Sequence, residues 1–260
     1  MSPIFSLSHP ESVWLTGASV CPAAIDRVPP DPRRCAERRR HFAGIAPGRA
    51  LATLLILFCG IGTVIAAGAG SLSIDLSRQQ IGAPPQDFEF WRAGVADAGH
   101  WKVVREASTD SGRSIEQSGA DRAARSSLAI YARASVLNAR VRARFNLIDG
   151  SMPSAGIALR VTSPDDYYLV RASALEQRLS VLHVVHGAPE EIAGVDAEIA
   201  QSHWQSLEVV TNGNSFSVSL NDQWALTAFD YGKLAGGQFG LWTERDDVTR
   251  FDQIEMAPLT

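Results

Sequence analysis

The stretch AGIALRVTSPDDYYLVRASALEQRLSVLHVV, residues 155–185, decides the fold of this chain. Apolar and polar residues alternate along three short runs, and alternation is typical of β-strands, in which successive side chains point to opposite faces. The sequence SPDD at residues 163–166 separates the first two runs and is rich in turn-forming residues. We therefore predict consecutive antiparallel strands joined by tight turns.

The same period of two continues along the rest of the chain from residue 88 onward. In NARVRARFNLIDG, residues 138–150, apolar residues alternate with an arginine ladder formed by Arg140, Arg142 and Arg144. Turn signals recur at short intervals, at residues 212–213, 221–222 and 236–237. Ten or more short strands without a long amphipathic helix predict an all-β fold, an antiparallel β-sandwich of the jelly-roll type.

Two segments depart from simple alternation. VTRFDQIEMA, residues 248–257, alternates imperfectly, which indicates a β-bulge. EEIAGVDAEIAQ, residues 190–201, has the spacing of one or two helical turns, so a short helix is expected there.

The N-terminal part of the sequence reads as an export signal. Four arginines (Arg38, Arg39, Arg40 and Arg49) precede an apolar run at residues 50–67, and small residues follow up to Gly70. This order of basic, apolar and small residues is typical of a secretory signal helix cleaved before Gly70, and the long apolar run also fits an uncleaved membrane anchor. We therefore expect a disordered leader with a basic region (1–48), a signal peptide or anchor (49–69), a linker (70–85) and a jelly-roll domain (86–260).

The expected location follows from this organisation. The domain would be periplasmic, secreted or anchored facing outside the cytoplasm, and it would touch a membrane only through residues 50–67 of an uncleaved signal. All three cysteines lie before residue 60, so the domain holds no disulfide, thiolate metal site or cysteine nucleophile. Residues 71–260 carry more carboxylates than basic groups and no basic cluster with interleaved aromatics, which argues against nucleic acid as a partner.

Residues 155–187 also resemble the central hairpins of bacterial concanavalin A-like lectin/glucanase domains. The matching positions are Gly156, Arg160, Asp166, Tyr167, Tyr168, Arg171 and Glu176. Residues 203–230 resemble the laminin-G pattern, and residues 236–256 are similar to the family's closing strands. The resemblance covers roughly residues 86–257, extends to 3-keto-disaccharide hydrolase-like domains and family-16 glycoside hydrolases, and implies a jelly roll.

The sequence departs from the family-16 enzymes at the catalytic motif. Those hydrolases place three carboxylates on one strand face as E-[apolar]-D-x-x-E, which supplies the close carboxyl pair that retaining hydrolysis needs. This motif is absent. The resemblance therefore implies carbohydrate recognition without cleavage. Glu244 and Asp247 are the weak catalytic candidates if the chain is instead a glycosidase of the 3-keto-disaccharide hydrolase type.

Strand parity predicts which tyrosine belongs to the core. An arginine is rarely buried without a partner, so Arg160 and Arg171 should mark the face turned away from the core. Tyr168 and Val170 would then point into the core, whereas Tyr167 would lie on the face of Arg171.

The same parity predicts a ligand site on that face. Trp242 alternates with core residues, and Glu244 shares its parity. Sugars bind by stacking on aromatic rings, with fixed polar groups holding their hydroxyls. We therefore predict a carbohydrate site formed by Arg160, Tyr167, Arg171, Trp242 and Glu244.

Each candidate also has a plainer interpretation. Arg171 and Glu244 would form a surface ion pair that Trp242 covers, and the arginine ladder would pair with carboxylates across strands instead of binding acidic polysaccharide. His183 and His186 are three residues apart, so their rings should face opposite ways and share no metal ion. Asp165 and Asp166 lie in a turn where a structural calcium is possible, and no other cofactor is expected. A laminin-G-like module that binds protein is the remaining alternative to a glycan partner.

Overall fold

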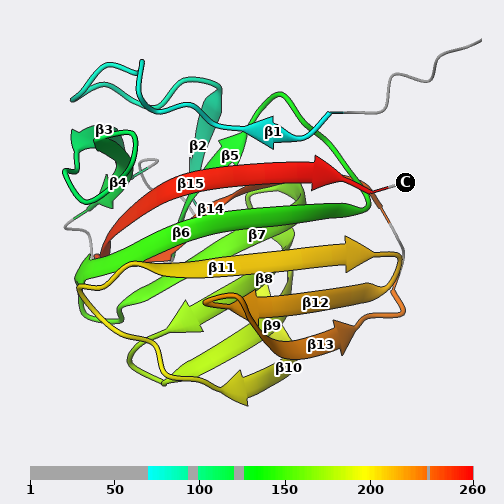
Figure 1. Ribbon diagram of the computed structural model, residues 1–260. Coiled ribbons are helices and arrows are strands. Elements are labelled where there is room, and N and C mark those ends of the chain that lie inside the picture. Colours follow the sequence, from blue (N-terminus) through cyan, green and yellow to red (C-terminus); the bar gives the residue numbers. More distant parts are fainter. Residues whose placement is uncertain (1–69, 93–98, 120–125, 233–234, 260) are drawn as a thin grey trace, which may run out of the picture. The chain divides into compact units, whose positions relative to one another are not determined.

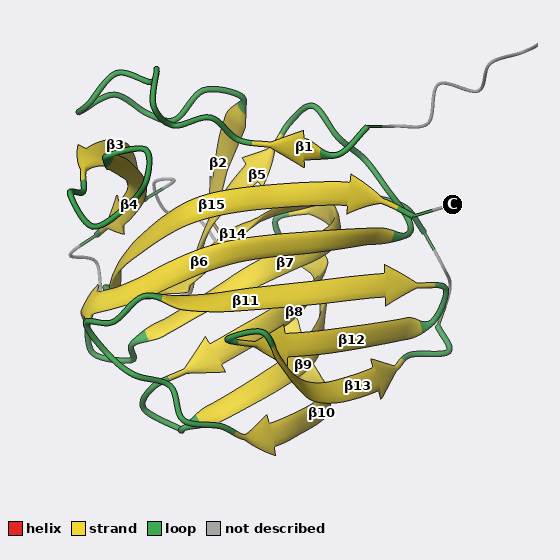
Figure 2. Ribbon diagram, in the orientation of Figure 1, coloured by secondary structure: helices red, strands yellow, loops and turns green. Residues whose placement is uncertain are grey.

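The computed structural model describes residues 70–92, 99–119, 126–232 and 235–259. These residues form fifteen β-strands and no helix, so the predicted all-β class is confirmed (Figures 1 and 2). The predicted leader and signal segment, residues 1–69, lie outside the described residues. Within the described ranges, no helix is long and apolar enough to cross a membrane.

The strands build two antiparallel sheets that pack face to face. Sheet A has the order β13–β12–β11–β6–β15–β4–β3, and β1 pairs with β15. Its strands are β1 (Leu72–Ser73), β3 (His100–Arg105), β4 (Arg113–Ser118), β6 (Ala139–Asp149), β11 (Gln205–Asn212), β12 (Ser215–Leu220), β13 (Gln223–Phe229) and β15 (Val248–Pro258).

Sheet B has the order β10–β9–β8–β7–β14–β5–β2. Its strands are β2 (Phe88–Arg92), β5 (Ser126–Tyr131), β7 (Ser154–Ser163), β8 (Asp166–Ser173), β9 (Arg178–Val185), β10 (Ala188–Asp196) and β14 (Gln238–Glu244). The predicted hairpins of residues 155–185 are therefore the β7–β8–β9 meander at the centre of this sheet.

The core lies between the two sheets. Phe145 and Phe251 of sheet A and Ile157 and Phe239 of sheet B are almost completely buried in one apolar cluster. Burying such a side chain stabilises the fold by roughly 1.5–3 kcal/mol. Leu76 belongs to the same cluster. Part of the predicted linker, residues 70–85, therefore packs against the domain.

The arginine ladder of β6 lies on the outer face of sheet A. Its partners are carboxylates of neighbouring strands and turns, in the pairs Arg140–Glu208, Arg142–Glu208, Arg142–Asp222 and Arg144–Asp252. Cross-strand pairing therefore accounts for the ladder, as the plainer interpretation predicts.

The predicted irregularity of β15 is confirmed. The register with β6 shifts between Asp252 and Glu255, and Gln253 within the shift has a φ of 46°. The short helix expected within residues 190–201 is wrong. Residues 188–196 form the edge strand β10, because they pair with β9 while Ile192 and Val195 pack against the core.

A bulge in β7 changes the direction of one predicted site residue. Arg160 has a φ of 49°, and the pairing of β7 with β8 shifts register between Leu159 and Ser163. Against β14, β7 carries one extra residue between Ala158 and Val161, and one extra residue breaks the alternation of faces. Leu159 therefore packs in the core, whereas Val161 belongs to an apolar cluster on the opposite face of the sheet.

The bulge turns Arg160 into the space between the sheets. Its guanidinium lies 5.0 Å from the ring centroid of Phe216 and 5.7 Å from that of Tyr168. It donates hydrogen bonds to the carbonyl oxygens of Leu137 (3.1 Å) and Gly213 (2.6 Å). The prediction that Arg160 lies on the outer face with Arg171 is wrong, because the left-handed residue at the bulge reverses its side.

Candidate functional site

The outer face of sheet B, turned away from the core, carries a second apolar cluster. Its buried members are Leu128, Ile130, Ala158, Val161, Tyr167, Leu169, Leu182, Val184 and Trp242. They come from five neighbouring strands, β5, β7, β8, β9 and β14. An antiparallel sheet commonly has one apolar face on the core and one polar face in solvent. Sheet B departs from this pattern, because both of its faces carry apolar clusters. The outer cluster forms the apolar floor of the candidate site.

The two tyrosines separate as parity predicts. Tyr168 packs in the core, where its ring stacks on His183 at a centroid distance of 4.2 Å and its hydroxyl donates to Asp230 Oδ2 at 2.8 Å. Burial raises the pKa of Tyr168 to about 12. Tyr167 belongs to the outer cluster, so the prediction for both side chains is confirmed.

Gly156 lies at the centre of the site. It pairs with Arg171 of β8 on one side and with Trp242 of β14 on the other, so these three residues form one row across the outer face. A Cβ atom at Gly156 would lie 2.7 Å from Leu169 Cδ1 and 3.5 Å from Trp242 Cε3. The glycine therefore provides the space into which these two side chains pack.

Tyr167 reaches toward the same row. Burial raises the pKa of Tyr167, the polar side chains of Ser126 and Trp242 lower it in part, and the negative charges of Asp165 and Glu244 raise it further. Tyr167 and Trp242 belong to the same outer cluster, and Glu244 lies two residues beyond Trp242 on the same strand.

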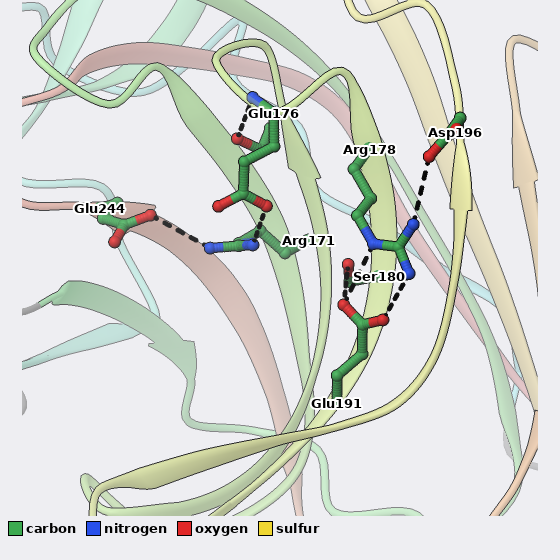
Figure 3. Close-up of polar contacts among 8 residues, drawn as sticks. Arg171, Glu176, Arg178, Ser180, Glu191, Asp196 and Glu244 are labelled. Atoms are coloured by element: carbon green, nitrogen blue, oxygen red, sulfur yellow. Dashed lines mark hydrogen bonds and ion pairs between the residues drawn. The ribbon is translucent and has the colours of Figure 1, made fainter. Parts of the chain in front are cut away.

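Arg171 and its carboxylate partners form the polar border of the apolar floor. Arg171 donates to Glu176 Oε2, and its Nη1 lies 3.6 Å from Glu244 Oε2 (Figure 3). Its buried Nε makes no hydrogen bond within the described part of the chain. Burial raises the pKa of Glu244, and the charge of Arg171 lowers it in part. The predicted ion pair is confirmed, and it leaves donor and acceptor capacity unused.

A second charged group continues this border across β9 and β10. Arg178 donates to Glu191 Oε1 at 2.6 Å and to Asp196 Oδ1 at 3.2 Å, and Ser180 Oγ donates to Glu191 Oε2 at 2.8 Å (Figure 3). The hydrogen bond from Arg178 holds the pKa of Glu191 below its usual value. Guanidinium and carboxylate groups thus alternate along one side of the outer face.

Asp247, the other weak catalytic candidate, is fully buried beyond the end of β14. Its carboxylate accepts hydrogen bonds from the backbone N–H groups of Met152 (3.2 Å) and Ser154 (2.9 Å), at the connection between β6 and β7. Burial raises its pKa to about 7. Asp247 therefore has a structural role, because its carboxylate stabilises the loop that leads into β7.

The remaining candidates lie away from the outer cluster. Both carboxylate oxygens of Asp166 are used: one accepts from Ser163 Oγ in the same turn, and the other accepts from the backbone N–H of His186 in the turn between β9 and β10. His183 lies 3.2 Å from Asp230, so the two histidines have different carboxylate neighbours. Across the ranges that the structure describes, no three His, Cys, Asp or Glu side chains are grouped so that they could hold a metal ion.

The structure thus brings together four of the five predicted site residues, Tyr167, Arg171, Trp242 and Glu244, and leaves out Arg160. It also adds residues that parity alone did not select. Glu176 matches the family motif, which was a usable signal, whereas Ser126 and Trp91 carried none. Trp91 packs against the outer cluster from β2.

Comparison with known proteins places the fold. No family model and no curated protein matches the sequence. The carbohydrate binding module CBM66 from Bacillus subtilis is 20% identical with a TM-score of 0.50, covering 60% of this chain and 91% of that chain. The cellulose induced protein Cip1 is 11% identical with a TM-score of 0.54, covering 72% of this chain and 97% of that chain. These likenesses show a two-sheet jelly-roll fold.

Proposed function

We propose that this chain binds carbohydrate on the outer face of sheet B and does not cleave it. The observation that carries the proposal is the convergence of Tyr167, Trp242, Arg171 and Glu244 around Gly156. Sugar rings present apolar C–H faces and a rim of hydroxyls, so they suit an apolar aromatic wall beside fixed polar groups. A similar fold in a protein described as a carbohydrate binding module supports the same class of ligand.

The exposure of the site residues suggests how a sugar would be held. Trp242 is only 5% exposed and Tyr167 only 4%, so neither ring offers a free face on which a sugar could stack. The side chain of Glu176 is 38% exposed, and those of Arg171 and Glu244 are 16% and 15% exposed. We therefore expect hydrogen bonds to Arg171 and its carboxylates to supply most of the recognition, with charged groups giving the stronger bonds.

The second candidate function is hydrolysis of the 3-keto-disaccharide hydrolase type. One observation favours it, because a carboxyl group whose pKa is near 7 is suited to donate a proton to a leaving group. Asp247 is fully buried, however, and its carboxylate is already bound to two backbone N–H groups. These two observations favour binding over hydrolysis. Binding without cleavage predicts no product from native or 3-keto disaccharides.

We also propose that the domain is exported. The support is the order of basic, apolar and small residues within residues 38–70 of the sequence. Export would expose the domain to extracellular or cell-envelope polysaccharides, in agreement with a glycan ligand.

Glycan-array binding tests the proposed site. Trp242→Ala and Arg171→Ala are each expected to weaken binding of the best glycan about tenfold. The first removes the aromatic ring of the site, and the second removes a charged hydrogen-bond donor. Arg171→Lys keeps the charge but loses the planar fork, so it should recover only part of the affinity. Arg140→Ala, on the outer face of sheet A, is the matched control and should bind as the parent does. If none of the site variants weakens binding to any glycan, the proposal is wrong.

A further inference from the structure

The edge strand β13 carries a row of exposed aromatic rings on the other sheet. Trp224 is 69% exposed and Phe229 54%, and Tyr231, just beyond the strand, is 82% exposed. They are the exposed aromatic side chains of the described residues. Figure 1 shows β13 beside β12 at the border of sheet A, and among the described strands β13 pairs with β12 alone.

Two of these rings lie on the outer face of sheet A. Leu226 and Ala228 of β13 pack in the core. Phe229 is next to Ala228 on the strand, so it has the opposite parity, and Trp224 pairs with Ser219 of β12 across a bulge. The rings of Phe229 and Tyr231 are nearly parallel, with centroids 6.4 Å apart and an interplanar angle of 11°. The strand and the residue just beyond it therefore present three exposed aromatic rings, two of which stack on each other.

Hydroxyl groups lie beside the rings. The outward residues of β12 are Ser215, Ser217 and Ser219, none of which is fully buried. Ser217 Oγ lies 3.1 Å from Thr227 Oγ1, and Trp224 Nε1 donates to the same Thr227 oxygen at 3.3 Å. This hydrogen bond holds the indole of Trp224 beside the hydroxyl groups of Ser217 and Thr227.

The charge of this surface distinguishes a lipid membrane from a neutral sugar chain as the partner. The sequences of β12 and β13, SFSVSL and QWALTAF, contain no charged residue. A surface for anionic lipid would need lysines or arginines around the rings. The flanking carboxylates are already engaged, Asp222 with Arg142 and Asp230 with Tyr168. Exposed rings flanked by hydroxyls therefore match a neutral sugar chain, which offers C–H faces and hydroxyls and no charge of its own.

We propose that Trp224, Phe229 and Tyr231 form a second carbohydrate surface, which takes a neutral, extended polysaccharide along the β13 edge. This surface lies on sheet A, so it does not depend on the site proposed on sheet B. A chain with two such surfaces would hold a polymer more tightly than either surface alone, because the second contact is made at high effective concentration.

Binding to microcrystalline cellulose and to chitin, measured as depletion of protein from solution, tests the proposal. The parent protein should bind at least one of them, and Trp224→Ala/Phe229→Ala should weaken that binding about tenfold. Tyr231→Ala is a second variant at a largely exposed side chain, so its weaker binding would not reflect misfolding. Ile81→Ala, an exposed apolar residue outside β13, should bind as the parent does.

The Trp242→Ala variant separates the two surfaces. In this background Trp224→Ala/Phe229→Ala should still weaken polysaccharide binding, because the β13 edge acts independently of the sheet B site. The inference is overturned if the parent binds neither polymer, or if the β13 variants bind as well as the parent. It is also overturned if sedimentation velocity shows that these variants dissociate an oligomer, because the rings would then join two copies of the chain.

Discussion

Replacing Arg160 with alanine is expected to lower the free energy of unfolding by about 2–4 kcal/mol. The substitution removes two hydrogen bonds to the partly buried carbonyl oxygens of Leu137 and Gly213, and the contacts of the guanidinium with Phe216 and Tyr168. It also leaves a space beside these two aromatic rings that the guanidinium had filled. Urea denaturation followed by tryptophan fluorescence measures the effect.

Arg140→Ala provides the matched control for this prediction. Its side chain is 58% exposed and its carboxylate partner is 3.8 Å away, so the loss should stay within about 0.5 kcal/mol. A loss at Arg160 as small as that at Arg140 would show that the buried guanidinium does not hold the sheets together.

The stability of the domain is expected to fall as the pH rises from about 4 to about 7. Burial raises the pKa of Asp247 to about 7, whereas an aspartate in an unfolded chain titrates near 3.9. The folded state therefore binds this proton more tightly, so the stabilisation is complete below the unfolded pKa and is lost as the pH rises through the folded one. A shift of about three units corresponds to roughly 4 kcal/mol.

Asp247→Asn isolates this contribution. An asparagine still accepts a backbone N–H but does not ionise, so the variant should become more stable than the parent above pH 7 and lose that advantage toward pH 4. Burial also raises the pKa of Glu244, so the difference between the two proteins is the quantity to follow across the pH range. A difference that does not change with pH would contradict the assignment.

Strand parity predicted much of the outer face of sheet B. Period-two alternation identified the separate sides of Tyr167 and Tyr168 and the outward direction of Trp242, because these residues lie on regularly paired strands. The same reasoning failed at Arg160. The pattern Ile157, Leu159, Val161 looks regular in the sequence, but a left-handed residue between the last two reverses the alternation.

Residues 190–201 show a second limit. Their apolar spacing fits a helix as well as a strand, and the choice was made by pairing with β9, the preceding strand of the same hairpin. Site residues such as Ser126 and Glu244, which pair across β5 and β14, were likewise brought together by a register that no local pattern contains. Sequence therefore predicted which faces residues occupy, and tertiary pairing decided which of them meet.

The most direct test of the carbohydrate site is to watch one of its residues while a glycan binds. The chain has six tryptophans, and the indole N–H resonance of Trp242 can be assigned in a ¹⁵N–¹H spectrum by its disappearance in Trp242→Phe. On titration with the tightest glycan from the array, this resonance is predicted to shift and to saturate with the binding curve. A glycan that binds while the Trp242 resonance stays unchanged would contradict the assignment of carbohydrate binding to the outer face of sheet B.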